Sequence, residues 1–277
     1  MKAKRFYVIG DPIGHSLSPI MHGAAFRALD LPHTYEAMRV TATELPRVLD
    51  RVRRGEIHGL NVTVPHKVEA MGLCDVLTDE ASAVGAVNTL YVDHTGRLVG
   101  TNTDCDGLRA DLHGEGVVPK HVLLLGTGGA ARAASIAMRT LEARLGIAGR
   151  DDAAARALVH AVGTGEAVPW SSLAGGPWDL LINATSAGML GGPDGTPIAE
   201  AWTRAPKAHG AVAYDLVYRP RVTPFLARAA AEGARAIGGL GMLVEQGARA
   251  LSIFLGAPID LGVRRVMRNA VEAALTG

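Results

Sequence analysis

A lysine placed just beyond a short strand is the first residue in this chain whose position suggests chemistry. The segment GLNVTVPHK, residues 59–67, alternates side chains as a strand does. Pro65 has no N–H to give to a sheet, so the strand cannot continue through it. Lys67 therefore stands at the exit of a strand, and an ammonium held in such a place can protonate a substrate oxygen.

A carboxylate at a second strand end is a suitable partner for this lysine. Asp104 lies in GTNTDCDG, residues 100–107, and can hold the ammonium of Lys67 in place. A single lysine is usually a solvated surface group, and a single aspartate is usually a turn or cap residue. Further polar residues at strand ends favour a site instead, because polar groups in apolar surroundings need partners. These residues are Asn61, Thr63, Asn88 and Thr103.

Two serine hydroxyls precede a predicted helix near the N-terminus. They belong to Ser16 and Ser18 in the segment HSLSP, residues 15–19. Hydroxyls and free N–H groups at a helix N-terminus suit a carboxylate ligand.

A glycine-rich turn predicts a dinucleotide site. The segment GTGGAA, residues 126–131, follows the apolar run Val122–Leu125 and opens a helix of small residues. The first glycine permits the tight turn, the second lets a pyrophosphate approach the backbone, and the small third position lets helix and strand pack closely. The helix N-terminus then offers N–H groups to the phosphates. Glycines can also serve only to make a tight turn, but the strand–turn–helix context favours dinucleotide binding.

The end of the next strand bears on which dinucleotide binds. An acidic residue there usually contacts the ribose of NAD, whereas an arginine accommodates the 2′-phosphate of NADP. This chain has Arg150 and Asp151 side by side. Asp151 is also suited to cap the helix that follows, which leaves Arg150 to favour NADP.

The elements that must position these residues fall into two runs of alternating strands and helices. The first run extends to about residue 104 and includes a predicted hairpin, whose two arms are GAVNTLYVD and GRLVGTNTD. The second begins near residue 120, with further strands predicted at ARLGIAGR, WDLLINAT and GAVAYDLVY. Two amphipathic helices, in residues 241–256 and 262–275, end the chain. This alternation predicts an α/β protein with a doubly wound parallel sheet in its second part.

Composition excludes several classes of protein. The 277 residues include 28 Lys plus Arg against 27 Asp plus Glu, which gives no support to a nucleic-acid or anionic-membrane partner. Cys74 and Cys105 are too few for a disulfide framework, which favours a reducing compartment. No apolar run approaches the roughly 18–20 residues of a membrane span. We therefore expect a soluble, cytoplasmic globular protein.

A series of segments resembles the shikimate dehydrogenase family, in the order in which that family has them. The resemblance covers essentially the whole sequence, and several of the motifs are peculiar to the family. The segments are DPIGHSLSPIMHGAAF, GLNVTVPHK, GAVNTL, GTNTDCDG, GTGGAARA, NATSAGM, YDLVY and GLGMLVEQGA.

The resemblance implies a two-domain α/β fold, with an N-terminal substrate domain and a Rossmann-like doubly wound dinucleotide-binding domain. The substrate domain would be discontinuous, comprising residues 1–104 and 240–277, and residues 105–239 would bind NADP. The implied activity is the reversible reduction of 3-dehydroshikimate to shikimate by hydride transfer from NADPH, in the shikimate pathway to chorismate and the aromatic amino acids. The expected partner is this small-molecule substrate, with no nucleic acid or membrane, and the expected enzyme is a monomer or homodimer.

The resemblance also implies roles for individual residues. Lys67 becomes the catalytic acid/base and Asp104 its partner, while Ser16 and Ser18, helped by Tyr218, hold the substrate carboxylate. The residues implied to bind or organise the substrate hydroxyls are Asn61, Thr63, Lys67, Asn88, Asp104 and Gln246. Those implied on the cofactor side are Asp79, Gly126, Thr127, Gly128, Gly129, Ala130, Arg150, Leu216 and Gly239. No metal is expected.

One segment departs from the family pattern. The family commonly has Asn-Arg-Thr or Asn-Arg-Ser where this protein has Gly149-Arg150-Asp151. A hydroxyl suited to the 2′-phosphate is replaced by a carboxylate that would repel it, whereas the guanidinium of Arg150 can still clamp a phosphate bidentately. We expect the preference for NADP to be weakened rather than abolished.

Other functions stay open at this point. Relatives that accept quinate or aminated analogues, with NAD in place of NADP, form the main alternative. A regulatory protein that kept the fold and lost the chemistry is disfavoured by the intact Lys67 and Asp104. Short-chain alcohol dehydrogenases would need a Tyr-x-x-x-Lys pair, which the sequence lacks. Medium-chain enzymes would need zinc ligands, and the two cysteines are far from a metal-ligand spacing, which disfavours zinc. A methylene-tetrahydrofolate-type dehydrogenase is disfavoured by the HSLSP and NTD segments.

Overall fold

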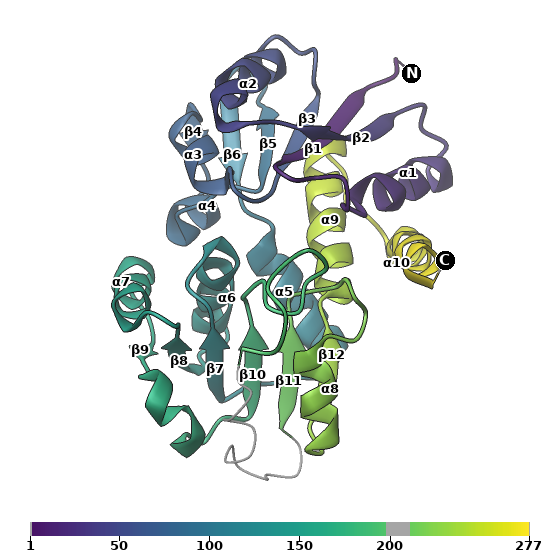
Figure 1. Ribbon diagram of the computed structural model, residues 1–277. Coiled ribbons are helices and arrows are strands. Elements are labelled where there is room, and N and C mark those ends of the chain that lie inside the picture. The colour runs from purple at the N-terminus through teal and green to yellow at the C-terminus, as the bar shows by residue number, and fades with distance from the viewer. Residues whose placement is uncertain (1, 198–210, 277) are drawn as a thin grey trace. The chain divides into compact units, whose positions relative to one another are not determined.

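The computed structural model describes residues 2–197 and 211–276, with side chains for all of these except residues 174 and 175. The polypeptide divides after Gly107 and after Leu243 into two compact units, and each unit contains its own sheet with flanking helices (Figure 1). The first unit combines the N-terminal part of the protein with the segment from Val244 onward. The second is the continuous stretch Leu108–Leu243.

The sheet of the first unit is mixed. Its strand order is β2-β1-β3-β5-β6-β4, with β5 antiparallel to both β3 and β6 and the other pairs parallel. β1 is buried over most of its length and β3 over all of it, which agrees with the mainly apolar residues of these two strands. The predicted hairpin is confirmed as β5 and β6. The strands are β1 (Arg5–Gly10), β2 (Thr34–Arg39), β3 (Gly59–Val62), β4 (Val76–Leu77), β5 (Thr89–Val92) and β6 (Leu98–Thr101).

Helices cover this sheet and begin at clear local signals. Thr41 and Glu44 form a reciprocal capping box before α2, and the hydroxyl of Thr78 accepts a hydrogen bond from the N–H of Ala81 at the start of α4. The elements of this unit are α1 (Ser18–Ala28), η1 (Ala42–Glu44), α2 (Leu45–Arg53), α3 (Lys67–Gly72), α4 (Asp79–Val84) and α10 (Leu261–Thr276). Two helices cross the division: α5 (Asp104–Gly114) enters the second unit after Gly107, and α9 (Leu240–Leu255) enters the first unit at Val244.

The sheet of the second unit is entirely parallel, with the order β12-β11-β10-β7-β8-β9. Its first strand, β7, lies in the middle and the polypeptide winds outward in both directions, which is the Rossmann arrangement. β7, β8, β10 and β11 are buried almost throughout, as a sheet covered on both faces requires. The strands are β7 (His121–Leu125), β8 (Arg144–Ala148), β9 (Glu166–Ala167), β10 (Leu180–Asn183), β11 (Val212–Asp215) and β12 (Arg235–Gly238).

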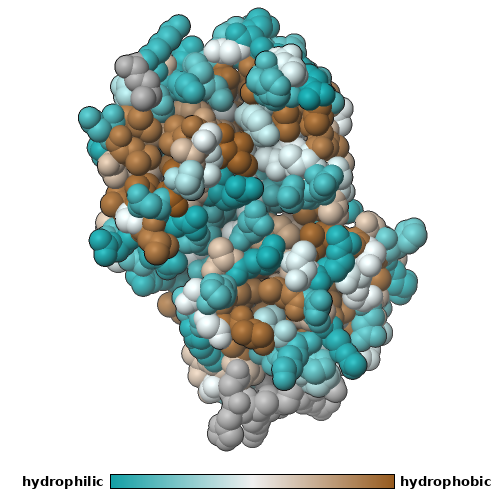
Figure 2. Space-filling view, turned by 180° about the vertical axis from the view of Figure 1, so that it is seen from behind, coloured by the Kyte–Doolittle hydropathy of each residue, from teal (hydrophilic) through white to brown (hydrophobic). Residues whose placement is uncertain are grey.

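The helices wholly within the second unit are α6 (Gly129–Thr140), α7 (Asp152–Val162) and α8 (Pro224–Ala231), with the short η2 (Trp170–Gly175). No element was predicted for the residues of α8 and β12. Figure 2 shows apolar patches separated by hydrophilic side chains on one face of the molecule. Within the described part of the protein, no helix is both long and apolar enough to cross a membrane.

Candidate active site

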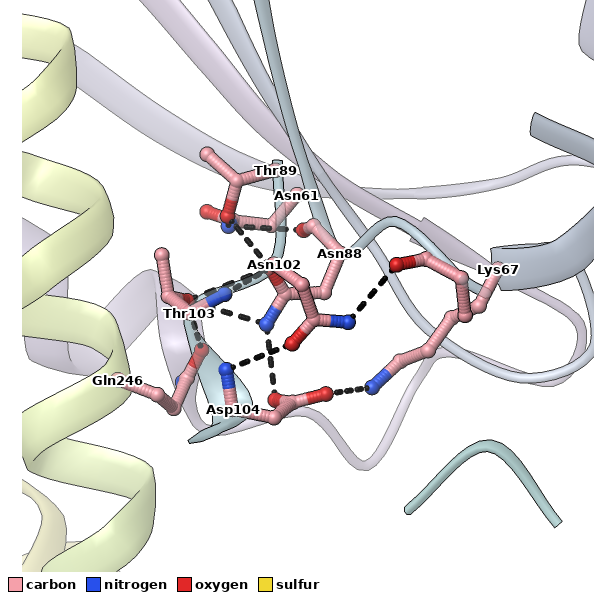
Figure 3. A network of polar contacts seen from close by, with 9 residues as sticks. Asn61, Lys67, Asn88, Thr89, Asn102, Thr103, Asp104 and Gln246 are labelled. Carbon is pink, nitrogen blue, oxygen red and sulfur yellow. Dashed lines mark hydrogen bonds and ion pairs between the residues drawn. The ribbon is translucent and has the colours of Figure 1, made fainter. Parts of the chain in front are cut away.

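Lys67 and Asp104 form an ion pair that is largely withdrawn from solvent. The ammonium Nζ of Lys67 donates to Oδ2 of Asp104 over 2.6 Å, and the two side chains are only 18% and 10% exposed (Figure 3). Lysine and aspartate are rarely so buried unless they are paired. An ammonium carries three donors, so the pair leaves Lys67 two further N–H bonds to offer a substrate oxygen.

Local structure explains how this pair is positioned. Lys67 is the first residue of α3, and its backbone C=O accepts a hydrogen bond from the N–H of Val87. Asp104 is the first residue of α5, and its backbone N–H donates to Oδ1 of Asn102 over 3.0 Å. Each of these two residues therefore stands at a helix start that is tied to a neighbouring segment.

Asn88 orients the carboxylate of Asp104. The N–H of Thr103, which can only donate, meets Oδ1 of Asn88 at 2.9 Å, so the amide nitrogen of Asn88 must face the other way. That nitrogen donates to Oδ1 of Asp104 over 2.8 Å and to the hydroxyl of Thr103 over 3.0 Å. Both oxygens of Asp104 thus accept hydrogen bonds, one from Asn88 and one from Lys67.

Asn61 is held by the same kind of backbone constraint. The C=O of Asn88 can only accept, so the group of Asn61 that lies 3.1 Å from it is the amide nitrogen. The same nitrogen donates to the hydroxyl of Thr89 over 2.9 Å, and Thr89 in turn donates to Oδ1 of Asn88 over 2.8 Å. Both N–H bonds of Asn61 are therefore used within the protein, and its amide helps to hold Asn88 and Thr89 in position.

Gln246 joins the group from α9. The hydroxyl of Thr103 donates to Oε1 of Gln246 at 3.4 Å. Glycine is required at position 107, because a Cβ there would lie 2.6 Å from the Cβ of Gln246. Absence of a side chain at Gly107 lets α5 and α9 approach closely enough to bring Gln246 beside Thr103.

The remaining residues predicted to bind substrate are less constrained. Thr63 is half-buried between β3 and α3, while Ser16 lies in the loop before α1 and its hydroxyl accepts from the N–H of Ser18 over 3.3 Å. Ser18 is buried at the start of α1. These three residues belong to the same unit as Lys67, whereas Tyr218 belongs to the second unit, where burial raises the pKa of its phenol.

The glycine turn of the second unit connects β7 to α6 and contains two different kinds of glycine. Gly126 has a φ of +117°, and a Cβ there would lie 2.9 Å from the C=O of Ala184, so the protein itself requires glycine. Among the residues that the structure describes, none lies within 4 Å of a Cβ placed at Gly128. Gly128 therefore leaves open space over the N-terminus of α6, which is where a pyrophosphate binds in this kind of turn.

Arg150 and Asp151 follow β8 beside this turn. A Cβ at Gly149 would lie 2.9 Å from the methyl group of Thr127, which places this segment against the turn. The carboxylate of Asp151 accepts from the N–H of Ala153 over 2.8 Å and caps α7, as expected from the sequence. Arg150 is exposed and is the cation at this strand end that can meet a 2′-phosphate.

A buried aspartate ties together the loops after β10 and β11. Asp215 accepts from the side chains of Asn183 (2.9 Å) and Thr223 (2.5 Å) and from the N–H of Val217 (3.0 Å). Burial raises the pKa of the Asp215 carboxyl to about 6. The sequence analysis singled out the surrounding motifs, NATSAGM and YDLVY, but assigned no role to Asn183 or Asp215.

Leu216 and Gly239, both predicted near the nicotinamide, lie together. A Cβ at Gly239 would come within 2.5 Å of the C=O of Leu216, so only glycine allows the segments after β11 and β12 to approach. Asp79, the remaining residue predicted on the cofactor side, is exposed at the start of α4 in the first unit. Its contact with the cofactor therefore stays a prediction.

The predicted residues thus form two groups, one in each unit. A nearly buried Lys–Asp pair can move a proton at a substrate oxygen, and a parallel Rossmann sheet with an open glycine turn suits a nicotinamide dinucleotide. Together they define an α/β oxidoreductase that depends on a nicotinamide dinucleotide.

Comparison with known proteins identifies the family. The model described as "Shikimate dehydrogenase substrate binding domain" matches residues 8–90, and that described as "Shikimate 5'-dehydrogenase C-terminal domain" matches residues 239–272. A shikimate dehydrogenase (NADP(+)) from Methanococcoides burtonii is 40% identical, over 96% of this protein and 98% of its own length. The protein therefore belongs to the shikimate dehydrogenase family.

Solved structures agree with this assignment. A shikimate 5-dehydrogenase from Thermus thermophilus, in complex with NADP(H) and shikimate, is 36% identical with a TM-score of 0.85, over 98% of this protein and 100% of its own length. A ligand-free 5-ketofructose reductase from a Gluconobacter species is 31% identical with a TM-score of 0.86, over 99% of each protein. The fold is thus shared by reductases with different named substrates.

Proposed function

We propose that this protein catalyses the reversible, NADP-dependent reduction of 3-dehydroshikimate to shikimate, with Lys67 as the acid/base and Asp104 as its partner. The observation that carries the proposal is the nearly buried Lys67–Asp104 pair, oriented by Asn88, in a member of the shikimate dehydrogenase family. The enzyme is an oxidoreductase of the shikimate pathway and takes a small-molecule substrate.

In the direction of reduction, Lys67 donates a proton to the carbonyl oxygen of the substrate as that oxygen gains charge. Asp104 holds the ammonium in place through its 2.6 Å hydrogen bond and stabilises its positive charge. In the reverse direction, neutral Lys67 removes the proton from the hydroxyl. Bound NADPH supplies the hydride. General acid–base catalysis of this kind contributes about 10²–10⁴ in rate.

The other residues have supporting roles in this proposal. Ser16, Ser18 and Tyr218 hold the substrate carboxylate, while Thr63 and Gln246 contact its hydroxyls. Asn61 and Asn88, whose amide N–H bonds are used within the protein, hold the site in shape.

The cofactor would be held by residues of the second unit, with Asp79 as a further contact from the first. The open space at Gly128 fits the pyrophosphate, and the residues proposed around it are Gly126, Thr127, Gly129 and Ala130. Arg150 would bind the 2′-phosphate, and Leu216 and Gly239 would lie near the nicotinamide. This assigns residues 105–239 to NADP and residues 1–104 with 240–277 to the substrate.

We further propose a cytoplasmic enzyme that acts as a monomer or homodimer without nucleic acid or membrane. The balance of 28 basic and 27 acidic residues supports the part of this proposal that concerns nucleic acid and anionic membranes, because it offers no strong attraction to polyanions.

The test is the initial rate of nicotinamide reduction by the purified protein. Shikimate and quinate would each be paired with NADP and with NAD. We expect shikimate with NADP to give the highest kcat/KM and 3-dehydroshikimate to be the product. A higher kcat/KM with quinate would contradict the assignment of the substrate, and a higher value with NAD would contradict the role of Arg150.

A further inference from the structure

A buried tyrosine that the sequence analysis did not single out lies behind the proposed substrate site. Tyr35 is on β2, it is 6% exposed, and its hydroxyl donates to Oδ1 of Asn61 over 2.7 Å. The ring of Tyr35 stacks on His22, with centroids 4.1 Å apart and planes 8° from parallel. Tyr35 therefore contacts Asn61 of the proposed site directly.

The direction of the hydrogen bond from Tyr35 is determined by the backbone. Because the C=O of Asn88 requires the amide nitrogen of Asn61, the oxygen of Asn61 must face Tyr35. An amide oxygen only accepts, so the phenol must donate. Burial raises the pKa of Tyr35, which keeps this proton on the phenol.

A one-way series of hydrogen bonds then leads from Tyr35 to the catalytic pair. Tyr35 donates to Asn61, Asn61 to Thr89, and Thr89 to Asn88. Asn88 donates to Oδ1 of Asp104, whose other oxygen accepts from Lys67 (Figure 3 shows the series from Asn61 onward). The members of the series are buried and bonded to one another, so a displacement at one end is passed to the other.

We propose that Tyr35 is a positioning residue for the reaction: by donating to the buried Oδ1 of Asn61 it holds that amide, and through it the series of hydrogen bonds, where Asp104 and Lys67 need it. The inference rests on the proposed function, since it concerns the same catalytic pair. Without the phenol proton, Oδ1 of Asn61 is buried and unpaired while its nitrogen stays committed to Asn88 and Thr89, so Asn61 must shift to find a new donor and the series shifts with it.

The kinetic test is Tyr35→Phe, which removes the hydroxyl and keeps the ring stacked on His22. We expect kcat with shikimate and NADP to fall about tenfold, as loss of one buried hydrogen bond near the reacting groups implies, while KM for shikimate does not rise. The control is Tyr7→Phe, which removes a phenol from β1 in the same sheet and outside the series. General damage to the sheet would instead raise KM or lower kcat in both variants, which would overturn the proposal.

A second variant tests the order of the series. Thr89→Val breaks a later link, and we expect the Tyr35→Phe/Thr89→Val double variant to be no slower than the slower single variant. Effects on kcat that multiply would mean that the two hydroxyls act independently, and would overturn the proposal. If Tyr35→Phe does not fold, Thr89→Val alone must show the fall in kcat without a rise in KM.

A readout without turnover separates this inference from the proposed function. Asparagine-selective ¹⁵N labelling reports the amide NH₂ groups of Asn61 and Asn88, with those of Asn183 and Asn269 as internal controls. We expect Tyr35→Phe to speed hydrogen exchange at Asn61 and Asn88 but not at Asn183. Unchanged exchange at Asn61 would overturn the role of Tyr35, even if the wild-type protein proved inactive on shikimate.

Discussion

The Lys67–Asp104 pair shows at the scale of single residues how burial can be combined with charge. Removing two charges from water is costly unless the pair is close and its remaining atoms are bonded. Here the N–O distance is 2.6 Å and Asn88 occupies the second oxygen of Asp104. The ammonium keeps unused donors because its partner binds only one of three, which is what proton transfer to a substrate requires.

The first prediction at the scale of residues concerns Asp151 and the preference for NADP over NAD. Its carboxylate caps α7 but also brings negative charge beside Arg150, where a 2′-phosphate would bind. Asp151→Ser keeps a capping oxygen and removes the charge. We expect the ratio of kcat/KM with NADP to that with NAD to rise about three- to fivefold, consistent with the loss of one exposed like-charge repulsion. Asp151→Asn is the matched control and should raise the ratio similarly; an unchanged ratio in both variants would show that Asp151 does not oppose NADP.

Lys67 and Asp104 could be predicted as site residues because both are polar and follow the end of a strand. The structure brings them together. Tyr35 and Thr89 were missed, since both lie within strands and read as ordinary strand residues. Their importance depends on which atoms they face, and that information appears only when β2, β3 and β5 are assembled.

At the scale of elements, the turn between β7 and α6 contains one glycine that the fold requires and another that cofactor binding would require. The backbone of Gly126 and its contact with Ala184 demand glycine, whereas a Cβ at Gly128 would meet nothing within 4 Å among the described residues. Gly128 has φ −82° and ψ −171°, an extended conformation that alanine also adopts. The two glycines should therefore respond differently to the same substitution.

A pair of alanine variants tests this difference. Gly128→Ala should change the free energy of unfolding by no more than about 1 kcal/mol, yet raise the Kd for NADP at least tenfold, because the methyl group occupies the approach of the pyrophosphate. Gly126→Ala should lower the free energy of unfolding by more than about 1 kcal/mol through strain and collision. Urea denaturation and NADP titration measure both quantities. Wild-type NADP affinity in Gly128→Ala would remove the turn from the cofactor site.

Asp215 connects two loops at the carboxyl ends of β10 and β11, and its burial makes a pH-dependent contribution to stability. The pKa of its carboxyl is raised from 3.8 to about 6, so between these values the folded protein binds more protons than the unfolded state. The contribution of Asp215 to stability therefore decreases as pH rises from about 4 to 6.

Asp215→Asn should remove this dependence. The amide remains neutral at every pH and can keep bonds to Asn183, Val217 and Thr223, because the hydroxyl of Thr223 can accept as well as donate. We expect the variant to gain stability relative to the wild type as pH rises from about 4 to 6, by at most about 1.4 kcal/mol per pH unit. Free energies of unfolding from urea at several pH values across this range would show it, and a constant difference between the two proteins would contradict it.

At the scale of the whole molecule, the two units contain different parts of the proposed chemistry. Lys67, Asp104 and their supporting network lie in the first unit, and the glycine turn and Arg150 lie in the second. A change at Lys67 or Asp104 should therefore affect proton transfer and not cofactor affinity, whereas a change in the glycine turn should affect cofactor affinity and not proton transfer.

Much of this architecture could be predicted from sequence because the periodicities were strong. The apolar run Val122–Leu125 and the hairpin residues identified a parallel sheet and an antiparallel pair, both of which the structure confirms. The elements α8 and β12 were not predicted, since both are short: the buried face of α8 consists of Phe225, Leu226 and Ala229, and β12 buries only Ile237. Strand order also could not be derived from local pattern, because it depends on contacts between distant segments.

The most direct test of the central claim is the rate of hydride transfer in Lys67→Met, which removes the ammonium and keeps most of the apolar stem. Single-turnover measurement with saturating shikimate and NADP should show a rate about 10²–10⁴ times lower than that of the wild type. The Kd for NADP, measured on the same preparation, should stay within about twofold, because the turn proposed to bind it lies in the other unit. A near-normal rate of hydride transfer would contradict the account by removing Lys67 from the mechanism.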